Sequence, residues 1–349
     1  MPAMNALIIP TTCKLNCAAS VENAKITFAA SRAVSSLKGM QLESIDSFEA
    51  GQLVAVKVVR NNSGKLIRLN DLSTYAPIAG DVLVCLIGAN GSFKIEVITV
   101  PTAVNEWVVV NRGGLVGQPM FDVGESSLVV SYLGNLVKDN MPVKLTDKLP
   151  AEYKFYKPII AVVGTDTNTG KTVTTAKVIS ELKQMGLSVG ACKLTGICGD
   201  DILSYKDAGA DELVDFTDAG LPSTICTEET AVNAALKCIS SLQNNDVIVA
   251  EFGSTLIGGH PVLSILKAFN LSNLKVVVCC SDVPGAIGAM FLLASGANGL
   301  RPSLFSGLVA NSELACAKVL ETTGVPCASA AKFLLRTMIF QGVTNVELC

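Results

Sequence analysis

The strongest constraint on this chain is an apolar run, a glycine-bounded loop and a helical pattern in direct succession. The run at residues 159–163 precedes "GTDTNTGKT", residues 164–172, and a helix-like segment then extends to Gly186. A helix N-terminus offers unpaired N–H groups and the positive end of a dipole, so this order favours a polyphosphate site. Five residues separate Gly164 from Gly170, one more than in the strict phosphate-loop pattern.

The residue types in this loop predict separate roles. Gly164 and Gly170 let the backbone curl close to a ligand, and Lys171 would neutralise the β and γ oxygens. The Thr172 hydroxyl would bind Mg²⁺, while Asp166 either orders the loop or contacts the metal. The expected nucleotide-contacting residues of the loop are Gly164, Thr165, Asp166, Thr167, Asn168, Thr169, Gly170, Lys171, Thr172 and Val173.

Composition narrows the class of protein. The 349 residues are enough for two domains, and 50% are hydrophobic while 16% are charged, which favours strands buried on both faces of a parallel sheet. A net charge of −3 without a Lys/Arg-rich run predicts a small-molecule partner, not nucleic acid or a membrane surface. The N-terminus lacks a basic signal-peptide region, and Asp282 and Pro284 interrupt the most apolar window. We expect a soluble cytoplasmic protein whose 12 cysteines are mostly buried thiols.

The first half has the pattern of a small antiparallel β sheet or barrel. Between residues 51 and 134, short Val- and Ile-rich runs alternate with turn residues. Asn90-Gly91 in "GANGS" predicts a type I′ hairpin between "DVLVCLI" and "FKIEVITV", because both central positions of that turn need φ > 0. We therefore expect a mainly β domain over residues 1–140.

The second half alternates short apolar runs with helix-length segments. Residues 141–157 bring charges and, with the following Pro158, three prolines, and are expected to be a linker. Residues 158–349 then predict a doubly wound, mostly parallel α/β sheet of the P-loop type. In its first helix Gly186 is the expected left-handed C-cap. The expected buried face of that helix consists of Val173, Ala176, Ile179, Leu182 and Met185.

Two charged residues follow apolar strands where a parallel sheet holds its ligands. Lys193 ends "SVGACKL" and Glu251 ends "VIVAE". Ligands in α/β sheets bind at the carboxyl ends of the strands, so Lys193 is a candidate catalytic residue, with a solvated strand end as the alternative. A carboxylate in a central strand requires a cation or a donor, which makes Glu251 a candidate metal ligand or a structural acceptor.

The second half resembles dethiobiotin synthetase and related P-loop proteins. The similarity rests on "GTDTNTGKT", "GLSVGACKLTG", "VIVAEFG" and "SGLVANS", within residues 159–330. It implies that Lys193 reaches the phosphates and the reacting group, that Glu251 binds the metal, and that Asn311 reads adenine. A carboxylate after the second strand also belongs to the family pattern; Asp200 and Asp201 both occupy that region, and Asp201 is taken with Thr172 and Glu251 as the metal set.

The chain also departs from that family. The family lacks an N-terminal β domain, and "FGSTLIGGHP" replaces its glycine-rich segment after the metal-binding Glu, so its substrate is not carried over. A second resemblance, through "KLTG", "DAGADELVDFTDAG" and "NRGGLVG", is to the two-domain D-glutamate N-acetyltransferases. That likeness implies a phosphate loop that serves an acyl donor carrying phosphates, with acetyl-CoA as the alternative cofactor.

Three further features have open interpretations. The acidic stretch 207–220 is either a solvated loop or, through Asp215 and Asp218, an amine-binding site. His260 is the single histidine, and is either a surface or helix-entry residue or a general base. Arg112, before two glycines, either forms a hairpin corner or reaches an anionic ligand across the domains.

These expectations combine into one functional hypothesis with two alternatives. We expect a homodimeric Mg-ATP-binding P-loop enzyme that phosphorylates a small carboxylate or carbamate for attack by an amine. The alternatives are an N-acyltransferase that uses acetyl-CoA on an amino acid, and a nucleotide-gated accessory protein for cofactor or metal delivery. A shortage of His and of clustered Cys disfavours metal delivery.

Overall fold

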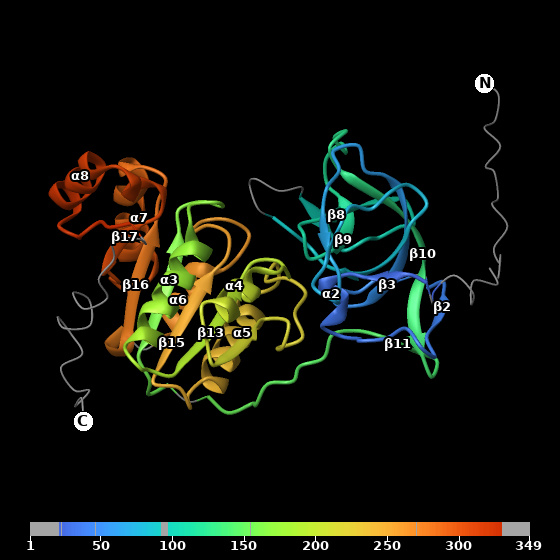
Figure 1. Cartoon of the computed structure of the whole chain (residues 1–349), viewed down its shortest axis with the longest axis horizontal. Coiled ribbons are helices and arrows are strands. Elements are labelled where there is room, and N and C mark those ends of the chain that lie inside the picture. Colours follow the sequence, from blue (N-terminus) through green and yellow to red (C-terminus); the bar gives the residue numbers. More distant parts are fainter. Residues whose placement is uncertain are drawn as a thin grey trace, which may run out of the picture.

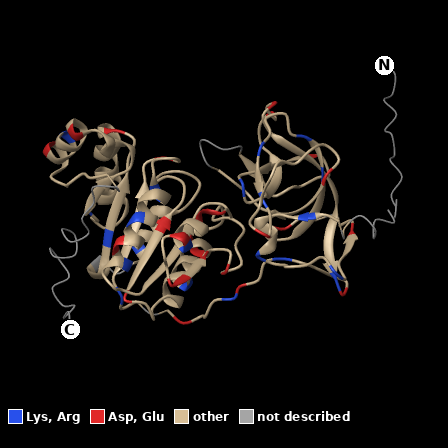
Figure 2. Ribbon diagram, in the orientation of Figure 1, with Lys and Arg blue, Asp and Glu red and all other residues tan. Residues whose placement is uncertain are grey.

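The chain forms a β barrel followed by an α/β body, joined by an extended segment (Figure 1). The computed structural model describes residues 21–329, apart from residues 22, 46, 92–96, 154 and 270. Figure 2 shows basic and acidic residues interspersed along the described ribbon of both halves. None of the described helices combines the length and apolar character needed to cross a bilayer.

Five strands close the barrel. Its ring follows the order β6, β3, β10, β8, β9, and β9 pairs back with β6. Closure leaves no open edge among these strands. The predicted β domain is therefore a barrel, but β6–β9 and β1–β6 are parallel pairs within an otherwise antiparallel sheet. The ring strands are β3 (Leu53–Arg60), β6 (Val82–Ile87), β8 (Glu106–Val110), β9 (Leu115–Pro119) and β10 (Leu128–Lys138).

Short elements flank this ring and extend it past the expected boundary. They are β1 (Lys25–Ile26), α2 (Phe28–Ser31), β2 (Gln41–Glu43), β4 (Ile67–Arg68), β5 (Thr74–Tyr75), β7 (Ile98–Thr99) and β11 (Met141–Pro142). β11 pairs with β10, and Leu145 is buried in a barrel cluster, so barrel structure reaches into the segment expected as a linker. The strands alternate: Val54 and Val56 pack with Trp107, whereas Leu53 and Ala55 belong to the other cluster.

The hairpin prediction at Asn90-Gly91 is wrong in its geometry. Neither residue has a positive φ, and the following residues 92–96 lie outside the described part of the chain. β6 and β7 each pair with β9 instead of with one another, although Asn90 bridges Ile98. A Cβ on Gly91 would lie 3.7 Å from Cα of Gly259, so the glycine allows a close approach to the α/β half.

The α/β half is a parallel sheet with helices packed against it. Its strand order is β14-β13-β15-β12-β16-β17, and every pairing is parallel. The strands are β12 (Ile159–Gly164), β13 (Val189–Thr195), β14 (Glu212–Asp215), β15 (Val247–Phe252), β16 (Leu274–Cys279) and β17 (Leu304–Ser306). The helices are α3 (Lys171–Gln184), α4 (Asp201–Asp207), α5 (Glu228–Ser241), α6 (Val262–Ala268), α7 (Val283–Gly296) and α8 (Glu313–Thr323), with 3₁₀ turns η1 (Leu271–Asn273) and η2 (Leu308–Asn311).

The buried face of α3 differs from the predicted one. Gly186 has φ +81° directly after the helix, as expected. However, Val173 is 68% exposed, whereas Thr174 and Val178 are buried beside Ile179. The first turn of α3 lies at the phosphate loop, where Val173 lines a cavity instead of packing on the sheet. The apolar periodicity therefore predicted the position of the helix correctly but assigned the wrong residues to its buried face.

The acidic stretch 207–220 is solvated in its first part, where Asp207, Asp211 and Glu212 are exposed, but not in its second. It contains the edge strand β14, and Asp215 is buried. Arg32, which follows α2, donates to Asp218 over 2.8 Å and lies 3.6 Å from Asp215. The positive partner of these carboxylates is therefore a side chain from the barrel, as expected for buried charges, which require pairing.

We predict that Arg32→Ala lowers the free energy of unfolding by about 2 kcal/mol near neutral pH, because two largely buried carboxylates lose their cation. Burial, followed by the charge of Asp215, raises the pKa of Asp218, and Arg32 opposes this rise. Loss of Arg32 raises the pKa of Asp218 further. The loss of unfolding free energy should therefore be largest above the folded-state pKa of Asp218, where this carboxylate is charged. It should shrink as the pH falls through that pKa and the carboxylate is protonated. Urea unfolding at several pH values measures this; a deficit that does not depend on pH, or that the exposed Arg301→Ala control reproduces, contradicts it.

A second contact joins the NRGG loop of the barrel to the loop after β13. The Asn111 amide donates to the carbonyl oxygen of Cys198, and Arg68 donates to Asp200 over 3.1 Å. A Cβ on Gly113 would lie 2.5 Å from the same Cys198 oxygen. Only glycine fits between these two backbones.

Gly113→Ala is therefore expected to push the barrel away from the α/β half. We predict a loss of about 1–3 kcal/mol in unfolding free energy, the usual cost of overpacking. Cleavage in the segment 146–157 should also become faster under limited proteolysis. Gly288→Ala on α7 is the matched control, because nothing lies within 4 Å of its Cβ position. Equal protection of both variants would show that this contact does not hold the halves together.

Candidate functional site

The phosphate loop has the backbone of an anion site. It leaves β12 at Gly164 and enters α3 through Gly170, whose φ is +94°, after Asn168 with φ +62°. No side chain caps the N-terminus of α3, and its first turn has no acidic residue. The N–H groups of that turn therefore have no side-chain acceptor among the described residues, which leaves them available to a phosphate.

Lys171 is drawn back into this loop. Its Nζ donates to the carbonyl oxygen of Asp166 over 2.7 Å, and its side chain is buried. Burial lowers the pKa of Lys171, an effect that the charge of Glu251 opposes. A desolvated ammonium group forms a stronger hydrogen bond with a charged acceptor than with a neutral carbonyl oxygen. Phosphate oxygens therefore suit this position.

Thr172 and Glu251 bring two oxygen donors together below the loop. The Thr172 hydroxyl donates to Glu251 Oε1 over 3.1 Å, and the Tyr205 hydroxyl donates to Oε2 over 2.7 Å. Burial, followed by the charge of Asp201, raises the pKa of Glu251. A buried carboxylate beside a hydroxyl fits Mg²⁺, which prefers oxygen ligands and keeps several waters. The described residues contain no group of three or more His, Cys, Asp or Glu side chains placed for a metal.

Lys193 lies at the end of β13, where the sequence predicts it. Its Nζ is paired with Asp201, the first residue of α4. Asp201 therefore contacts the Lys193 ammonium group and does not contact the Thr172–Glu251 pair. Burial lowers the pKa of Lys193, but Asp201 and Glu251 outweigh burial and raise it, so the side chain is a cation. A Cβ on Gly253 would lie 3.1 Å from Lys193 Cε, and this glycine leaves room for the lysine stem.

One cavity of about 570 Å³ connects these groups and is lined by both halves of the molecule. The barrel contributes Asn90, Asn111 and Arg112. The α/β half contributes Thr167, Asn168, Gly170, Lys171, Thr172, Val173, Lys193, Gly196, Ile197, Gly199, Asp200, Asp201, Glu251, Gly253, Ser254 and His260. The site is therefore composite, with a phosphate end at the loop and a second end under the barrel.

Most of the predicted site residues meet in this cavity, but some do not line it. Four residues of the phosphate loop do not line the cavity, namely Gly164, Thr165, Asp166 and Thr169. Asn311 does not line it either and is exposed at the end of η2. Arg112 does reach across from the barrel, 3.9 Å from Asp200, with about half of its side chain exposed.

His260 is not a surface residue. It is 3% exposed, and its Nδ1 lies 2.8 Å from the Thr224 hydroxyl. Burial, followed by the charge of Lys193, lowers its pKa to about 4. The ring is therefore neutral at physiological pH, which makes it a weak general base and leaves it able to donate or accept a hydrogen bond.

Sequence reasoning missed the partners of these groups. Tyr205 lies four residues after Asp201 on α4, so helical spacing could have placed it on the face that meets Glu251. Asn90 is brought to the cavity from the barrel, and Thr224 is brought to His260 by a contact over 36 positions within the α/β half; no local pattern indicates either residue.

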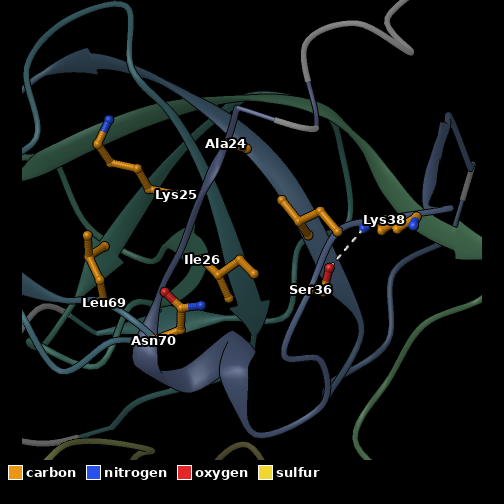
Figure 3. Close-up of a pocket in the computed structure, with 8 residues that line it drawn as sticks. Ala24, Lys25, Ile26, Ser36, Lys38, Leu69 and Asn70 are labelled. Atoms are coloured by element: carbon orange, nitrogen blue, oxygen red, sulfur yellow. Dashed lines mark hydrogen bonds between the residues drawn. The ribbon is translucent and has the colours of Figure 1, made fainter.

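A smaller cavity of about 350 Å³ lies in the barrel and contains no predicted site residue (Figure 3). It is lined in part by Lys25 and Lys38. Lys25 is 3.8 Å from Asp81 and lies over the Tyr75 ring, so its charge is already compensated within the barrel. This cavity shares no lining residue with the composite site.

Comparison with known proteins gives a partial likeness to P-loop structures. No family model and no curated protein matches the chain. A DUF1611 family protein from Anabaena variabilis ATCC 29413 aligns with 15% identity and a TM-score of 0.39, over 60% of this chain and 66% of that one. Chloroplast FtsY from Physcomitrella patens aligns with 15% identity and a TM-score of 0.33, over 52% and 61%. A ParA family ATPase from Chlorobium tepidum TLS aligns with 15% identity and a TM-score of 0.33, over 50% and 82%.

These alignments are too partial to assign an activity, and the chain spans less than two thirds of the first two proteins. The assignment of the fold rests on the chain's own geometry: a parallel sheet, a loop between β12 and α3, and charged residues at the carboxyl ends of neighbouring strands. This geometry supports only the general P-loop architecture that the resemblance to dethiobiotin synthetase implies. The C-terminal half is a parallel α/β fold in which the glycine-bounded loop between β12 and α3 has the architecture of a phosphate loop.

Proposed function

We propose that this protein is an Mg-ATP-dependent enzyme that phosphorylates a small carboxylate and passes the activated acyl group to an amine. The observation that carries the proposal is the composite cavity, which joins a phosphate loop to a second polar end built by the barrel. A protein that only bound a nucleotide would not need this second end, which the barrel lines beside two buried lysines.

The residues that line the composite cavity would have different tasks, according to where each of them lies. The loop and the first turn of α3 hold the nucleotide phosphates, with Lys171 against the terminal ones. Thr172 and Glu251 would hold Mg²⁺, which supplies charge neutralisation at the phosphate oxygens when bound. Lys193, fixed by Asp201, stabilises negative charge that develops between the donor and the acceptor.

The proposed reaction balances in two transfers. A carboxylate oxygen of the acceptor forms a bond to the terminal phosphorus while the bond from that phosphorus to the bridging oxygen breaks, which releases the nucleoside diphosphate. An amine then bonds to the acyl carbon, the carbon–oxygen bond to phosphate breaks, and the amine gives up a proton. Positioning and charge neutralisation carry both steps, so the protein needs no covalent intermediate.

Trapping with hydroxylamine tests this chemistry directly. Purified protein is incubated with Mg·ATP, hydroxylamine and a panel of mono- and dicarboxylates, and hydroxamate is measured beside ADP. The proposal predicts equal amounts of both products for one class of carboxylate. If ADP forms but no carboxylate gives hydroxamate, the activity is nucleotide hydrolysis and the proposed acyl activation is wrong. Thiol release from acetyl-CoA without nucleotide would replace the proposal by acyl transfer.

A further inference from the structure

The single histidine of the chain is held in one orientation by a buried hydrogen-bond chain. The Thr224 hydroxyl oxygen accepts from the Gly196 N–H over 3.0 Å and lies 2.8 Å from His260 Nδ1. The alternative acceptor for the hydroxyl proton, the Gly196 carbonyl oxygen, is 3.5 Å away. The better bond is from the hydroxyl to Nδ1, which makes Nδ1 an acceptor and places the ring proton on Nε2.

The barrel closes the cavity at this histidine. Gly259 lies against Gly91, where a Cβ on Gly259 would be 3.6 Å from Gly91 Cα. The adjacent barrel residue Asn90 lines the cavity together with His260 and Lys193. Nδ1 is engaged by Thr224, so Nε2 is the ring atom that His260 can offer to the cavity.

We propose that His260 determines specificity by donating its Nε2–H to a carboxylate oxygen of the acceptor substrate, at the barrel end of the cavity. This inference rests on the proposed function. A neutral donor suits the task, because it orients the carboxylate without neutralising it, and the carboxylate must stay nucleophilic towards phosphorus. Lys193 is already paired with Asp201, so the cation near this end is largely compensated.

The tautomer can be observed without knowing the natural substrate. Because the chain has one histidine, a sample labelled with ¹⁵N-histidine gives one pair of ring nitrogen signals. We expect a protonated Nε2 and an unprotonated Nδ1, with the ring neutral until the pH approaches its pKa of about 4. Thr224→Ser should retain this tautomer, and Thr224→Val should release it. A protonated Nδ1 in the native protein would overturn the inference.

Acetate, succinate and glutarate serve as carboxylate probes in the presence of Mg²⁺ and a non-hydrolysable ATP analogue. A saturable shift of the Nε2 signal by at least one of them is expected, and Thr224→Val and His260→Leu should each weaken binding of that probe roughly tenfold or more, as for a hydrogen bond to a charged group. His260→Gln, which can present an amide donor near the Nε2 position, should restore part of the affinity.

The outcomes separate the two proposals. If the nucleotide binds and no probe moves the ring signals saturably, the role of His260 is wrong and the proposed function stands. If a probe moves Nε2 but the nucleotide does not bind, the histidine contact stands and ATP-dependent chemistry is wrong.

Discussion

Lys171→Ala is expected to abolish the thermal stabilisation of this protein by Mg·ATP and to lower turnover at least about a hundredfold. A ligand that binds only the folded state contributes about 2.7 kcal/mol at a hundredfold excess over its dissociation constant, and the variant should lose that increment. The unliganded variant should unfold no earlier than the native protein, because Lys171 is a buried cation whose acceptor is a carbonyl oxygen. Thermal unfolding with Mg·ATP, Mg·GTP and acetyl-CoA measures all of this.

Lys177→Ala is the matched control for Lys171. It removes a lysine from the same helix, where Lys177 pairs with Glu181 over 3.2 Å outside the lining of the composite cavity. The control should keep the full response to the nucleotide. If the Lys171 variant keeps it as well, the loop between β12 and α3 does not hold phosphates. Stabilisation by acetyl-CoA alone would redirect the interpretation to acyl transfer.

Glu251→Gln is expected to raise the Mg²⁺ concentration needed for half-maximal activity by about tenfold to a hundredfold or more, the range seen when even an outer partner of a metal ligand is lost. The amide keeps an oxygen near Thr172 but loses the charge that a hard cation requires. A magnesium titration of turnover at saturating ATP measures the effect, with the affinity for metal-free nucleotide measured in parallel.

Tyr205→Phe separates charge from orientation at the same carboxylate. It deletes only the hydroxyl that donates to Glu251 Oε2, so the magnesium requirement should rise less than in Glu251→Gln. Glu181→Gln, on α3 but outside the lining of the composite cavity, should leave the titration unchanged. An identical magnesium curve for Glu251→Gln and the native protein would remove Glu251 from the metal site.

The phosphate half was predictable because its signals are local. The strand, the loop and the helix are consecutive, and the carboxyl ends of neighbouring parallel strands converge, so Lys171, Lys193 and Glu251 could be brought to one edge from their strand-end positions alone. The inner face of α3 was wrong at Val173, because apolar periodicity does not reveal that the first turn faces a cavity.

The barrel half was less predictable because its pairings are nonlocal. Turn chemistry at Asn90-Gly91 suggested a hairpin, whereas β6 closes the ring with β9 and Gly91 packs against Gly259. Likewise, the acidic stretch gives no local sign that Arg32, more than 180 residues earlier, pairs with Asp218. Interactions between distant segments carry no pattern in a single sequence, and the missed contacts of Asn90, Thr224 and Arg32 depend on them, whereas Tyr205 had a local signal in its spacing from Asp201.

The two-loop contact between the barrel and the α/β half has a consequence for how such a protein could be redesigned. The barrel lines the cavity with Asn90, Asn111 and Arg112, while the phosphate loop, Lys193, Glu251 and His260 all belong to the other half. One wall of the cavity is thus encoded in a separate stretch of the chain from the charged groups opposite it. Exchanging the two barrel loops should therefore change the shape and polarity of that wall and leave the side chains of the α/β half in place.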